Sequence, residues 1–212
     1  MEPRQRHLGA PRLHLRLTDS TNSRARDLAA AGAPDGTLVS AAEQSAGRGR
    51  QGRTWSAPAN TSLLCSLVLR EPPPLLSLIA GVALTETVDG ALAARAGTAR
   101  IKWPNDVVLD GRKVAGILVE GRPQQDWAVL GIGLNVALSV AQLPSELRDS
   151  AGTLGLPPTA IESVLAELLA ALERWLAAPA DLVLESLRAR DALRGHEVRW
   201  EDGRGVATGI DG

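Results

Sequence analysis

The sequence predicts an α/β fold, because segments with the pattern of strands alternate with segments with the pattern of helices. Three observations support this. Aliphatic runs at 62–69, 113–120 and 127–136 have the length and composition of buried strands. Asp110-Gly111, between two such runs, is a strong hairpin signal. From residue 75 to about 96, apolar residues recur at helical spacing, which indicates a long amphipathic helix.

The other elements follow from the same rules. Alternation or aliphatic runs predict strands at 13–17, 37–42, 100–109 (broken at Pro104 and resumed), 195–200 and 205–210, the last two joined by a turn at Asp202-Gly203. Periodicity predicts helices at 22–31, 159–177 and 180–193. Only one hydroxyl of Ser20 and Thr21 is needed to cap the first of these helices, so the other is free to face a ligand.

The length and composition of the chain are typical of a globular protein with one domain and a small appendage. The chain has 212 residues, 44% of them hydrophobic, and a net charge of −1, so nothing overall favours nucleic acid or a membrane. It lacks an apolar run of about 18 residues and a signal-peptide pattern, which leads us to expect a cytoplasmic protein. Cys65 permits no intrachain disulfide and has the apolar neighbours of inert core. The three histidines are scattered, so we expect no metal cluster built on them.

One polar stretch cannot pack as core. Gly47 to Arg53 contains three glycines and three arginines, and Trp55 follows. Glycines let a backbone approach a ligand, guanidinium groups suit an oxyanion such as phosphate, and an indole offers a face for stacking. We call residues 44–55 the arginine loop. By itself it fits a solvated basic loop equally well.

A phosphate-binding P-loop is rejected. Residues 47–54 read G-x-x-x-x-G-R-T, with Arg in place of the Lys of that motif. A P-loop leads directly into a helix, whereas Pro58 and a strand from Ser62 follow here.

The chain uses arginine as its routine cation and has only two lysines, Lys102 and Lys113. Lys113 begins a strand opposite the Asn105-Asp106 break, where irregular pleating aims side chains into a site. Gly116 and the Gly131-Ile132-Gly133 run interrupt aliphatic strands, which indicates close approach of a ligand or another backbone.

Five motifs, in this order and with these separations, resemble those of biotin–protein ligases: Ser20-Thr21-Asn22, Gly47-Arg48-Gly49-Arg50-Gln51-Gly52-Arg53-x-Trp55, Lys102-Trp103-Pro104-Asn105-Asp106, Lys113-x-Ala115-Gly116-Ile117-Leu118-Val119-Glu120 and Gly131-x-Gly133-x-Asn135. The resemblance covers roughly residues 13–210. It implies a mixed, largely antiparallel sheet with flanking helices, similar to class II aminoacyl-tRNA synthetase cores, plus a partial C-terminal SH3-like barrel.

The resemblance also implies a domain plan: an N-terminal tail at 1–12, a catalytic domain at 13–193, and the start of an SH3-like domain at 194–212, apparently incomplete. About a dozen residues precede the first strand, so we expect a monofunctional form without the DNA-binding domain that many members carry. Two strands cannot close a barrel, which puts the activity of this chain by itself in question.

The activity implied is ATP-dependent attachment of biotin to one lysine of a biotin carboxyl carrier domain, through biotinyl-5′-AMP, with Mg²⁺ accompanying ATP. By resemblance, Lys113 and Arg50 are catalytic. Biotin would contact Ser20, Thr21, Asn22, Gln44, Arg48 (through its backbone), Gly49, Arg50, Lys113, Gly116, Gly131 and Gly133, with the glycines flooring the slot for the bicycle and tail. ATP would contact Arg50, Arg53, Trp55, Lys102, Asn105, Asp106 and Asn135, and Asp106 is the candidate for the metal.

Further expectations complete the picture. Trp103 is expected in the core. The arginine loop has no apolar anchor between Gln44 and Trp55, which predicts disorder until a ligand arrives and a lid role afterwards. Lipoate or octanoate attachment on the same fold is an alternative, although its arginine-arginine and triple-glycine loop is absent. A second alternative function is a nucleic-acid-binding module built on the arginine loop, but the net charge of −1 disfavours it. The sequence does not decide the oligomeric state, and a homodimer is possible.

Overall fold

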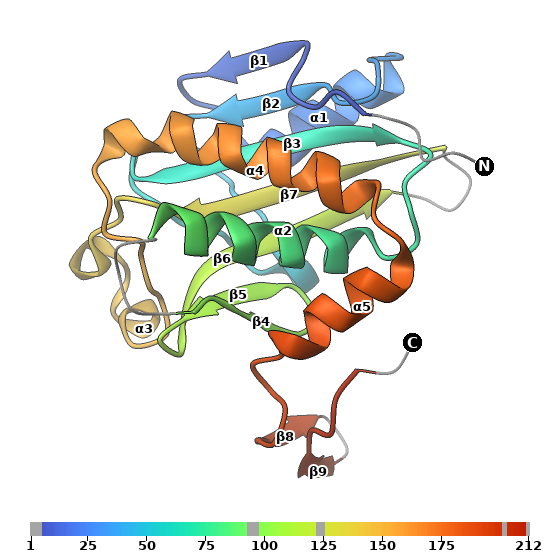
Figure 1. Ribbon diagram of the computed structural model, residues 1–212. Coiled ribbons are helices and arrows are strands. Elements are labelled where there is room, and N and C mark those ends of the chain that lie inside the picture. Colours follow the sequence, from blue (N-terminus) through green and yellow to red (C-terminus); the bar gives the residue numbers. More distant parts are fainter. Residues whose placement is uncertain (1–5, 93–97, 122–125, 201–202, 211–212) are drawn as a thin grey trace.

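The computed structural model describes residues 6–92, 98–121, 126–200 and 203–210. Its main sheet has the strand order β1-β2-β3-β7-β6-β5-β4 (Figure 1). β1 and β2 are parallel, and each other neighbouring pair is antiparallel. The predicted mixed, largely antiparallel sheet is therefore confirmed. The strands are β1 (Arg12–Leu15), β2 (Leu38–Ala41), β3 (Ser62–Arg70), β4 (Arg100–Lys102), β5 (Asp106–Leu109), β6 (Arg112–Gly121) and β7 (Trp127–Asn135).

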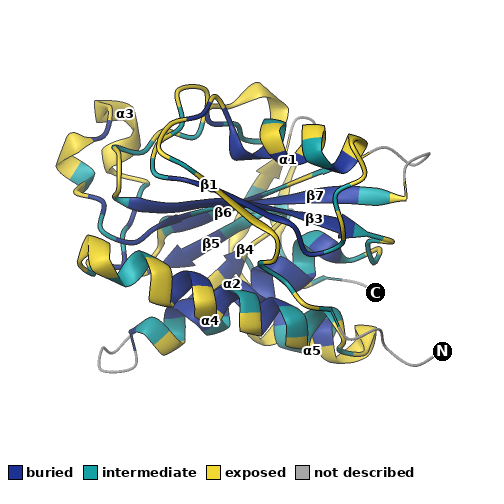
Figure 2. Ribbon diagram, turned by 90° about the horizontal axis from the view of Figure 1, so that it is seen from above, coloured by how far each residue is buried: buried dark blue, intermediate teal, exposed yellow. Residues whose placement is uncertain are grey.

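Helices cover the two faces of this sheet unequally. Figure 2 shows α1 (Thr21–Ala30) on one face and α2 (Leu76–Ala91), α4 (Ile161–Leu176) and α5 (Ala180–Ala189) on the other. Short turns of helix lie in the connections: η1 (Arg50–Gly52), η2 (Val140–Gln142), α3 (Ser145–Arg148) and η3 (Pro158–Ala160). The predicted extension of α2 to about Ala96 falls on residues 93–97, outside the described residues. In the described part of the chain, each helix is too short or too polar to cross a bilayer.

The larger core lies between the sheet and the α2–α4 layer. Alternate residues of β3, including Leu63, Cys65 and Leu67, point into it. Burial raises the pKa of the Cys65 thiol to about 12, because the thiolate would lose its hydration there. The expectation that Cys65 is inert core is confirmed.

A smaller core lies beneath α1. Ala25 and Ala29 of this helix pack on Val39, Val68 and Val129, on the face of β2, β3 and β7 opposite to α2. The helix reaches these three strands, and the part of the same face formed by β6 and β5 lies beyond it. Part of the sheet is therefore left without a helical cover, and the candidate site forms there.

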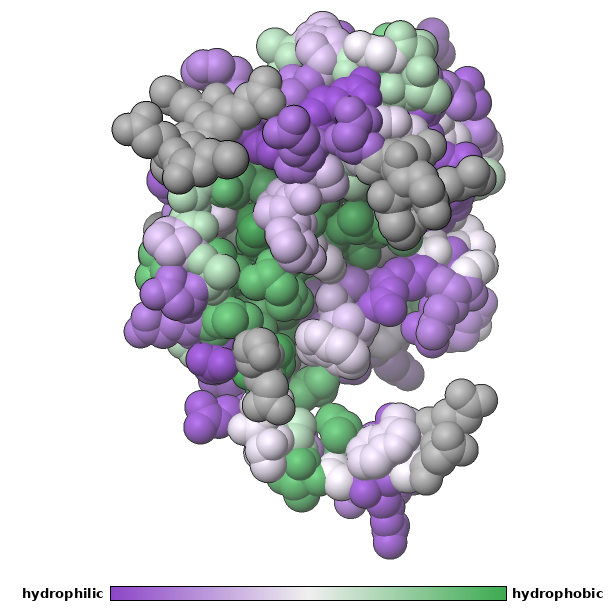
Figure 3. Space-filling model, turned by 90° about the vertical axis from the view of Figure 1, so that its right-hand side faces the viewer, coloured by the Kyte–Doolittle hydropathy of each residue, from purple (hydrophilic) through white to green (hydrophobic). Residues whose placement is uncertain are grey.

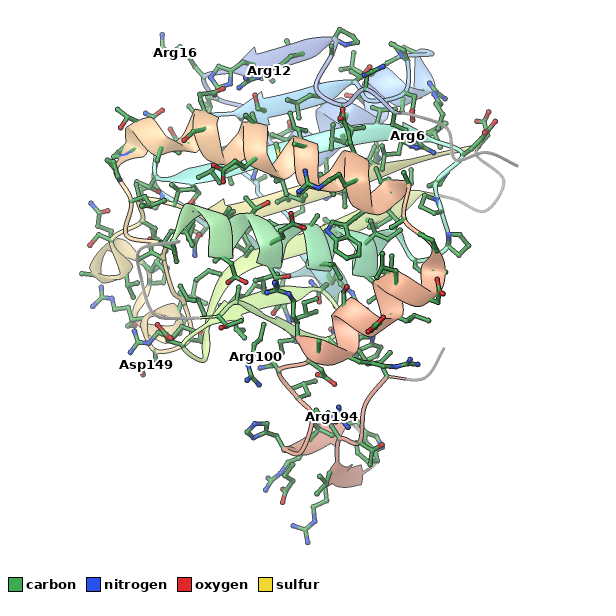
Figure 4. The ribbon with its side chains drawn as sticks, viewed as in Figure 1. Arg6, Arg12, Arg16, Arg100, Asp149 and Arg194 are labelled. Carbon is green, nitrogen blue, oxygen red and sulfur yellow. The ribbon has the colours of Figure 1, made fainter. Side chains whose placement is uncertain are left out.

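The N-terminal edge of the sheet is tied to α4. Arg12, labelled in Figure 4, donates to both carboxylate oxygens of Glu162, at 2.7 and 2.8 Å. Ahead of β1, Leu8 N donates to Glu173 Oε1 and Gly9 N donates to Gly36 O. Residues directly before the first strand therefore pack on the domain, and the strand begins at Arg12, one residue earlier than predicted.

The C-terminal segment forms a two-stranded antiparallel sheet of β8 (Glu197–Trp200) and β9 (Gly203–Val206). It stands apart from the main body as a small lobe (Figures 1 and 3). Arg188 of α5 donates to Ile210 O at 3.1 Å, which links the segment after β9 back to the domain. The predicted hairpin is thus present, although its second strand spans 203–206 rather than 205–210. The predicted turn residue Asp202 lies outside the described residues.

Candidate functional site

A pocket of ≈ 740 Å³ opens on the sheet face that α1 leaves uncovered. Its walls come from the start of α1, the arginine loop, the β4–β5 turn and the strands β6 and β7. It brings together most of the residues that the sequence nominated: Ser20, Thr21, Asn22, Gln44, Arg48, Gly49, Arg50, Arg53, Trp55, Lys102, Asn105, Asp106, Lys113, Gly116, Gly131 and Gly133.

A bulge in β6 turns Lys113 into this pocket. Val107 pairs with Ala115 but Val108 pairs with Lys113, so Val114 is an extra residue. Val114 and Ala115 are both buried in the core beneath α2, where strict alternation would have buried only one of them. Lys113 therefore shares the pocket face with Gly116, and its Nζ lies 3.4 Å from where a Cβ of residue 116 would be. The expected irregularity at this position is confirmed.

The ammonium of Lys113 has two neighbours in the pocket. Its Nζ lies 2.7 Å from Asp106 Oδ1, and it lies 5.5 Å from the centroid of the Trp55 ring. The Lys113 side chain is 37% exposed, so its charge remains accessible from the pocket. A compact cation held between a carboxylate and an aromatic face is suited to meet an anionic ligand.

The opposite end of the pocket is a network of neutral polar groups. Gln44 Oε1 accepts from Thr21 N at 2.7 Å and from Thr21 Oγ1 at 3.1 Å. Ser66 Oγ donates to Asn22 Oδ1 at 2.6 Å and lies 2.8 Å from Thr21 Oγ1. Neither Ser20 nor Thr21 caps α1 with its own side chain; Gln44, from the arginine loop, does so instead. The first turn of α1 and the loop are thereby held together.

The three glycines of the floor face different neighbours. A Cβ at Gly131 would come within 2.9 Å of Asn22 Nδ2, whereas one at Gly133 would come within 2.6 Å of Trp55 Cε2. A Cβ at Gly116 would come within 2.9 Å of Trp55 Cζ3. The expected single slot is therefore divided: the indole covers Gly116 and Gly133, and Gly131 faces the neutral polar end. Within the described residues, the buried Trp55 Nε1 has no hydrogen-bond partner.

The arginine loop folds as a compact turn. Trp55 N donates to Gly47 O at 2.9 Å and Gly49 N donates to Arg53 O at 2.7 Å. Gln51 and Gly52 have φ of 55° and 73°, the left-handed region that a tight reversal requires. Backbone bonds thus replace the missing apolar anchors. Disorder of the loop before ligand arrives, and its closure as a lid, stay predictions.

The pocket is strongly cationic. Among the described residues that line it are five cations, Arg48, Arg50, Arg53, Lys102 and Lys113, against the single carboxylate of Asp106. The whole chain carries a net charge of only −1, so positive charge is concentrated at this site. Such concentration favours a ligand that carries several negative charges.

Trp103 and Asn135 do not lie where the sequence led us to expect them, and the role of Asn135 toward ATP stays a prediction. Trp103 was expected in the core, but it is 54% exposed at the pocket mouth. It lies in the short connection between the antiparallel strands β4 and β5, where the chain reverses at the edge of the sheet. Asn135 does not line the pocket: its Oδ1 accepts from Ser62 Oγ and its Nδ2 donates to Gly152 O.

Four of the residues at or beside the pocket that the sequence did not nominate are Ser66, Glu120, Leu147 and Ser150. Ser66 is a polar residue inside the apolar strand β3, and that exception to the pattern was its only signal. Glu120 contacts Asn22 and Arg48 from β6, two residues beyond Leu118 and on the same face. Leu147 and Ser150 reach the pocket from the segment around α3, and no local pattern marks them.

A resident metal centre is not built into the described residues, which contain no group of three or more His, Cys, Asp or Glu side chains close enough to share an ion. Asp106 supplies one carboxylate, already paired with Lys113. Magnesium commonly binds through one or two carboxylates together with substrate phosphates. This donor set therefore fits a magnesium ion that arrives on a nucleotide.

Known proteins share this mixed sheet with its flanking helices. A model of the Biotin/lipoate A/B protein ligase family matches residues 14–136. The biotin–[acetyl-CoA-carboxylase] ligase of Mycobacterium tuberculosis is 37% identical over 213 residues, covering 92% of this chain and 77% of the relative. The chain therefore belongs to the biotin/lipoate A/B protein ligase family, and its matching relatives are biotin–protein ligases.

Solved structures agree. A biotin protein ligase from Aquifex aeolicus in complex with biotin and ATP has a TM-score of 0.80 at 26% identity, covering 96% of this chain and 89% of that one. The bifunctional ligase/repressor BirA of Bacillus subtilis is 38% identical over 146 residues, which are 65% of this chain and 44% of BirA. The chain thus spans less than half the length of the Bacillus relatives that it matches.

Proposed function

We propose that this protein attaches biotin to one lysine of a biotin carboxyl carrier domain, using ATP and passing through biotinyl-5′-AMP. The observation that carries the proposal is a single pocket with two chemically different ends. One end presents neutral hydrogen-bonding groups around Thr21, and the other presents the ammonium of Lys113 with the arginines of the loop. Biotin has the same polarity, with a neutral ureido ring at one end and a carboxylate at the other.

The neutral end suits the ureido ring. That ring has two N–H donors and one carbonyl acceptor, and the network around Gln44 and Asn22 is rich in oxygen acceptors with hydroxyls nearby. A buried ureido group left unpaired would cost about 1–3 kcal/mol. Fatty acids, which lack those donors, would leave the pocket's own polar groups unpaired and are disfavoured by a similar amount.

The cationic end suits adenylate formation. An oxygen of the biotin carboxylate attacks the α-phosphorus of ATP; the new P–O bond forms as the bond to the pyrophosphate oxygen breaks, and pyrophosphate leaves. Two anions must meet in this step, so fixed cations lower the barrier. Lys113, between Asp106 and the Trp55 ring, is assigned to the carboxylate and α-phosphate, and Arg50 and Arg53 to phosphate oxygens. Magnesium would enter bound to the ATP phosphates, with Asp106 as its candidate protein ligand.

Transfer follows at the pocket mouth. The ε-amine of the carrier lysine attacks the acyl carbon of the adenylate, a C–N bond forms, the C–O bond to phosphate breaks, and AMP leaves while the amine loses a proton. We assign the adenine to the exposed side of the Trp55 ring, since aromatic faces stack on bases. The amide of Asn135 would have to exchange its bonds to Ser62 and Gly152 before it contacted ATP, so it is the weakest of the nucleotide assignments.

Mass spectrometry tests the proposal directly. Incubating the chain with ATP, biotin and a carrier domain should add one biotinyl group to a single lysine, and omitting ATP should abolish the addition. Calorimetry should find biotin binding that tightens with ATP, and no binding of lipoate. Lipoate binding, or modification without ATP, would contradict the proposal.

We also infer where the protein acts and with what. ATP and carrier domains are available in the cytoplasm, so we place the reaction there. A net charge of −1 disfavours duplex DNA as a partner. Sedimentation tests whether two copies pair as a homodimer.

A further inference from the structure

Glu120 joins two parts of the site that are far apart in the sequence. Its Oε2 accepts from Asn22 Nδ2 at 2.8 Å, at the neutral end of the pocket. Its Oε1 accepts from a guanidinium nitrogen of Arg48 in the arginine loop, in close contact. Arg26 lies farther away, at 3.4 Å. One carboxylate on β6 therefore contacts both the first turn of α1 and the loop that covers the pocket.

The contact with Asn22 sets the direction of its amide. A carboxylate can only accept, so the Nδ2 side must face Glu120, and the second N–H of that group points to Leu118 O at 3.3 Å. Both donors of Asn22 are thereby used within the protein. Of the side-chain amide, Oδ1, which accepts from Ser66 Oγ, is the atom left to offer a ligand. Glu120 thus makes Asn22 an acceptor.

The contact with Arg48 anchors the loop. The guanidinium of Arg48 lies between Glu120 and Ser23 Oγ, the latter at 3.3 Å. Among the described residues of the arginine loop, Arg50 makes only one longer side-chain contact, 3.4 Å to Asn105. Gln44 holds the start of the loop to Thr21. For the part of the loop that carries the arginines, the side-chain attachment on the α1 side is made by Arg48, through Glu120 and Ser23.

We propose that Glu120 is a positioning residue that couples the closed arginine loop to the acceptor orientation of Asn22. It touches neither substrate, but it holds both groups in the arrangement that a ligand with N–H donors requires. The part of the proposal that concerns biotin rests on the proposed function; the part that concerns the loop does not.

Limited trypsin digestion of the full-length, ligand-free chain tests the loop. Cleavage after Arg50 and Arg53, followed by mass spectrometry, reports how often the loop opens. Glu120→Gln should raise both cleavage rates about fivefold, the factor that corresponds to about 1 kcal/mol for a partly exposed ion pair. Arg48→Gln should do the same, and the double variant should be no faster than either single one.

Controls separate this effect from general loosening. Glu162→Gln removes a carboxylate from an ion pair with Arg12 at the far edge of the sheet and should leave loop cleavage at the wild-type rate. Glu120→Asp keeps the charge and should restore part of the protection. Wild-type cleavage in Glu120→Gln, or additive effects in the double variant, would overturn the proposal. Circular dichroism confirms that each variant is folded.

Calorimetry tests the coupling to ligand. In the Glu120→Gln variant the new side-chain amide can donate to Asn22 Oδ1, which allows the amide of Asn22 to turn over. The affinity for biotin should therefore fall about tenfold. Saturating biotin should restore most of the rate of adenylate formation. An unchanged affinity for biotin, together with faster cleavage, would overturn the coupling and leave only the anchor. If the wild-type chain itself binds no biotin, the proposed function fails, and the trypsin result still decides the role of Glu120 in the loop.

Discussion

Replacing Gly131 by alanine tests the geometry of the neutral end most directly. Gly131 lies on β7 opposite Ser66, and its φ is not in the left-handed region, so the backbone itself accepts an alanine. The new Cβ would lie 2.7 Å from Asn22 Cγ and 2.9 Å from Asn22 Nδ2, and closer still to Oδ1. Normal contact distances are about 3.5–4.0 Å, so the amide must retreat by roughly 1 Å.

The cost of that retreat follows from the bonds that it breaks. Asn22 would lose Ser66 Oγ at 2.6 Å and Glu120 Oε2 at 2.8 Å. A neutral hydrogen bond contributes about 0.5–1.5 kcal/mol and one to a charged group about 1.5–3 kcal/mol. The free energy of unfolding should therefore fall by about 2–4 kcal/mol, and Tm by about 4–16 °C for a chain of this length. Biotin should bind at least about tenfold more weakly, since Asn22 would no longer present its acceptor.

The assays are thermal unfolding followed by circular dichroism and calorimetric titration with biotin. Gly90→Ala is the matched control: the nearest atom to a Cβ there is Glu167 Oε2 at 3.7 Å, and Gly90 lies in α2, where alanine is the better helix former. That variant should be as stable as the wild type or slightly more so. Equal Tm and equal biotin affinity for Gly131→Ala and wild type would show that Asn22 moves freely, and would refute the reasoning.

The remaining predictions concern four other sites. Lys113→Gln should slow pyrophosphate release about 10²-fold or more, because the cation that meets both the biotin carboxylate and the α-phosphate is lost. A decrease in that rate of less than about threefold would show that Lys113 does not take part in adenylate formation. Arg50→Gly should release biotinyl-AMP faster as the loop opens, and an unchanged off-rate would argue against a lid. Cys65 should resist iodoacetamide at pH 8 until the chain unfolds, because its pKa is about 12 in the folded core, so rapid labelling of the native chain would contradict that burial. The hydrogen bond from Arg12 holds the pKa of Glu162 below its ordinary 4.5. The pair Arg12–Glu162 should therefore contribute about 0.5 kcal/mol to the free energy of unfolding above pH 4.5, and this contribution should disappear as the pH falls further. The urea midpoints of wild type and Glu162→Gln should differ at pH 7 and converge near pH 2. A difference that stays constant with pH would contradict this prediction.

Local patterns in the sequence were sufficient for most of the sheet. The strands that flank Asp110-Gly111 could be predicted because a two-residue turn with positive φ at both positions has few alternatives, and the structure has φ of 51° and 75° there. An irregularity near Lys113 could be expected from the polar break at Asn105-Asp106, although Lys113 itself pairs with Val108 and Asp106 pairs with Gly116. In both cases the deciding interactions lie within a few residues of one another along the chain.

Long-range contacts explain what could not be predicted. Trp103 looked like core because tryptophan is usually buried, but its place in a tight connection overrides that preference. Glu120 reads as an ordinary strand-end charge until folding brings Asn22 and Arg48 to it. The split of the glycine floor depends on where the Trp55 ring comes to lie, which no spacing in the sequence specifies.

Because β6 contains an extra residue, the position of the Lys113 amine depends on the strand register as well as on the residue type. Lys113 and Gly116 are three positions apart, and regular alternation would put residues at that interval on opposite faces of the sheet. Without the bulge, the same sequence would point the amine of Lys113 into the apolar core beneath α2. Any attempt to transplant this pocket onto another scaffold should therefore preserve the bulge together with the side chains around it.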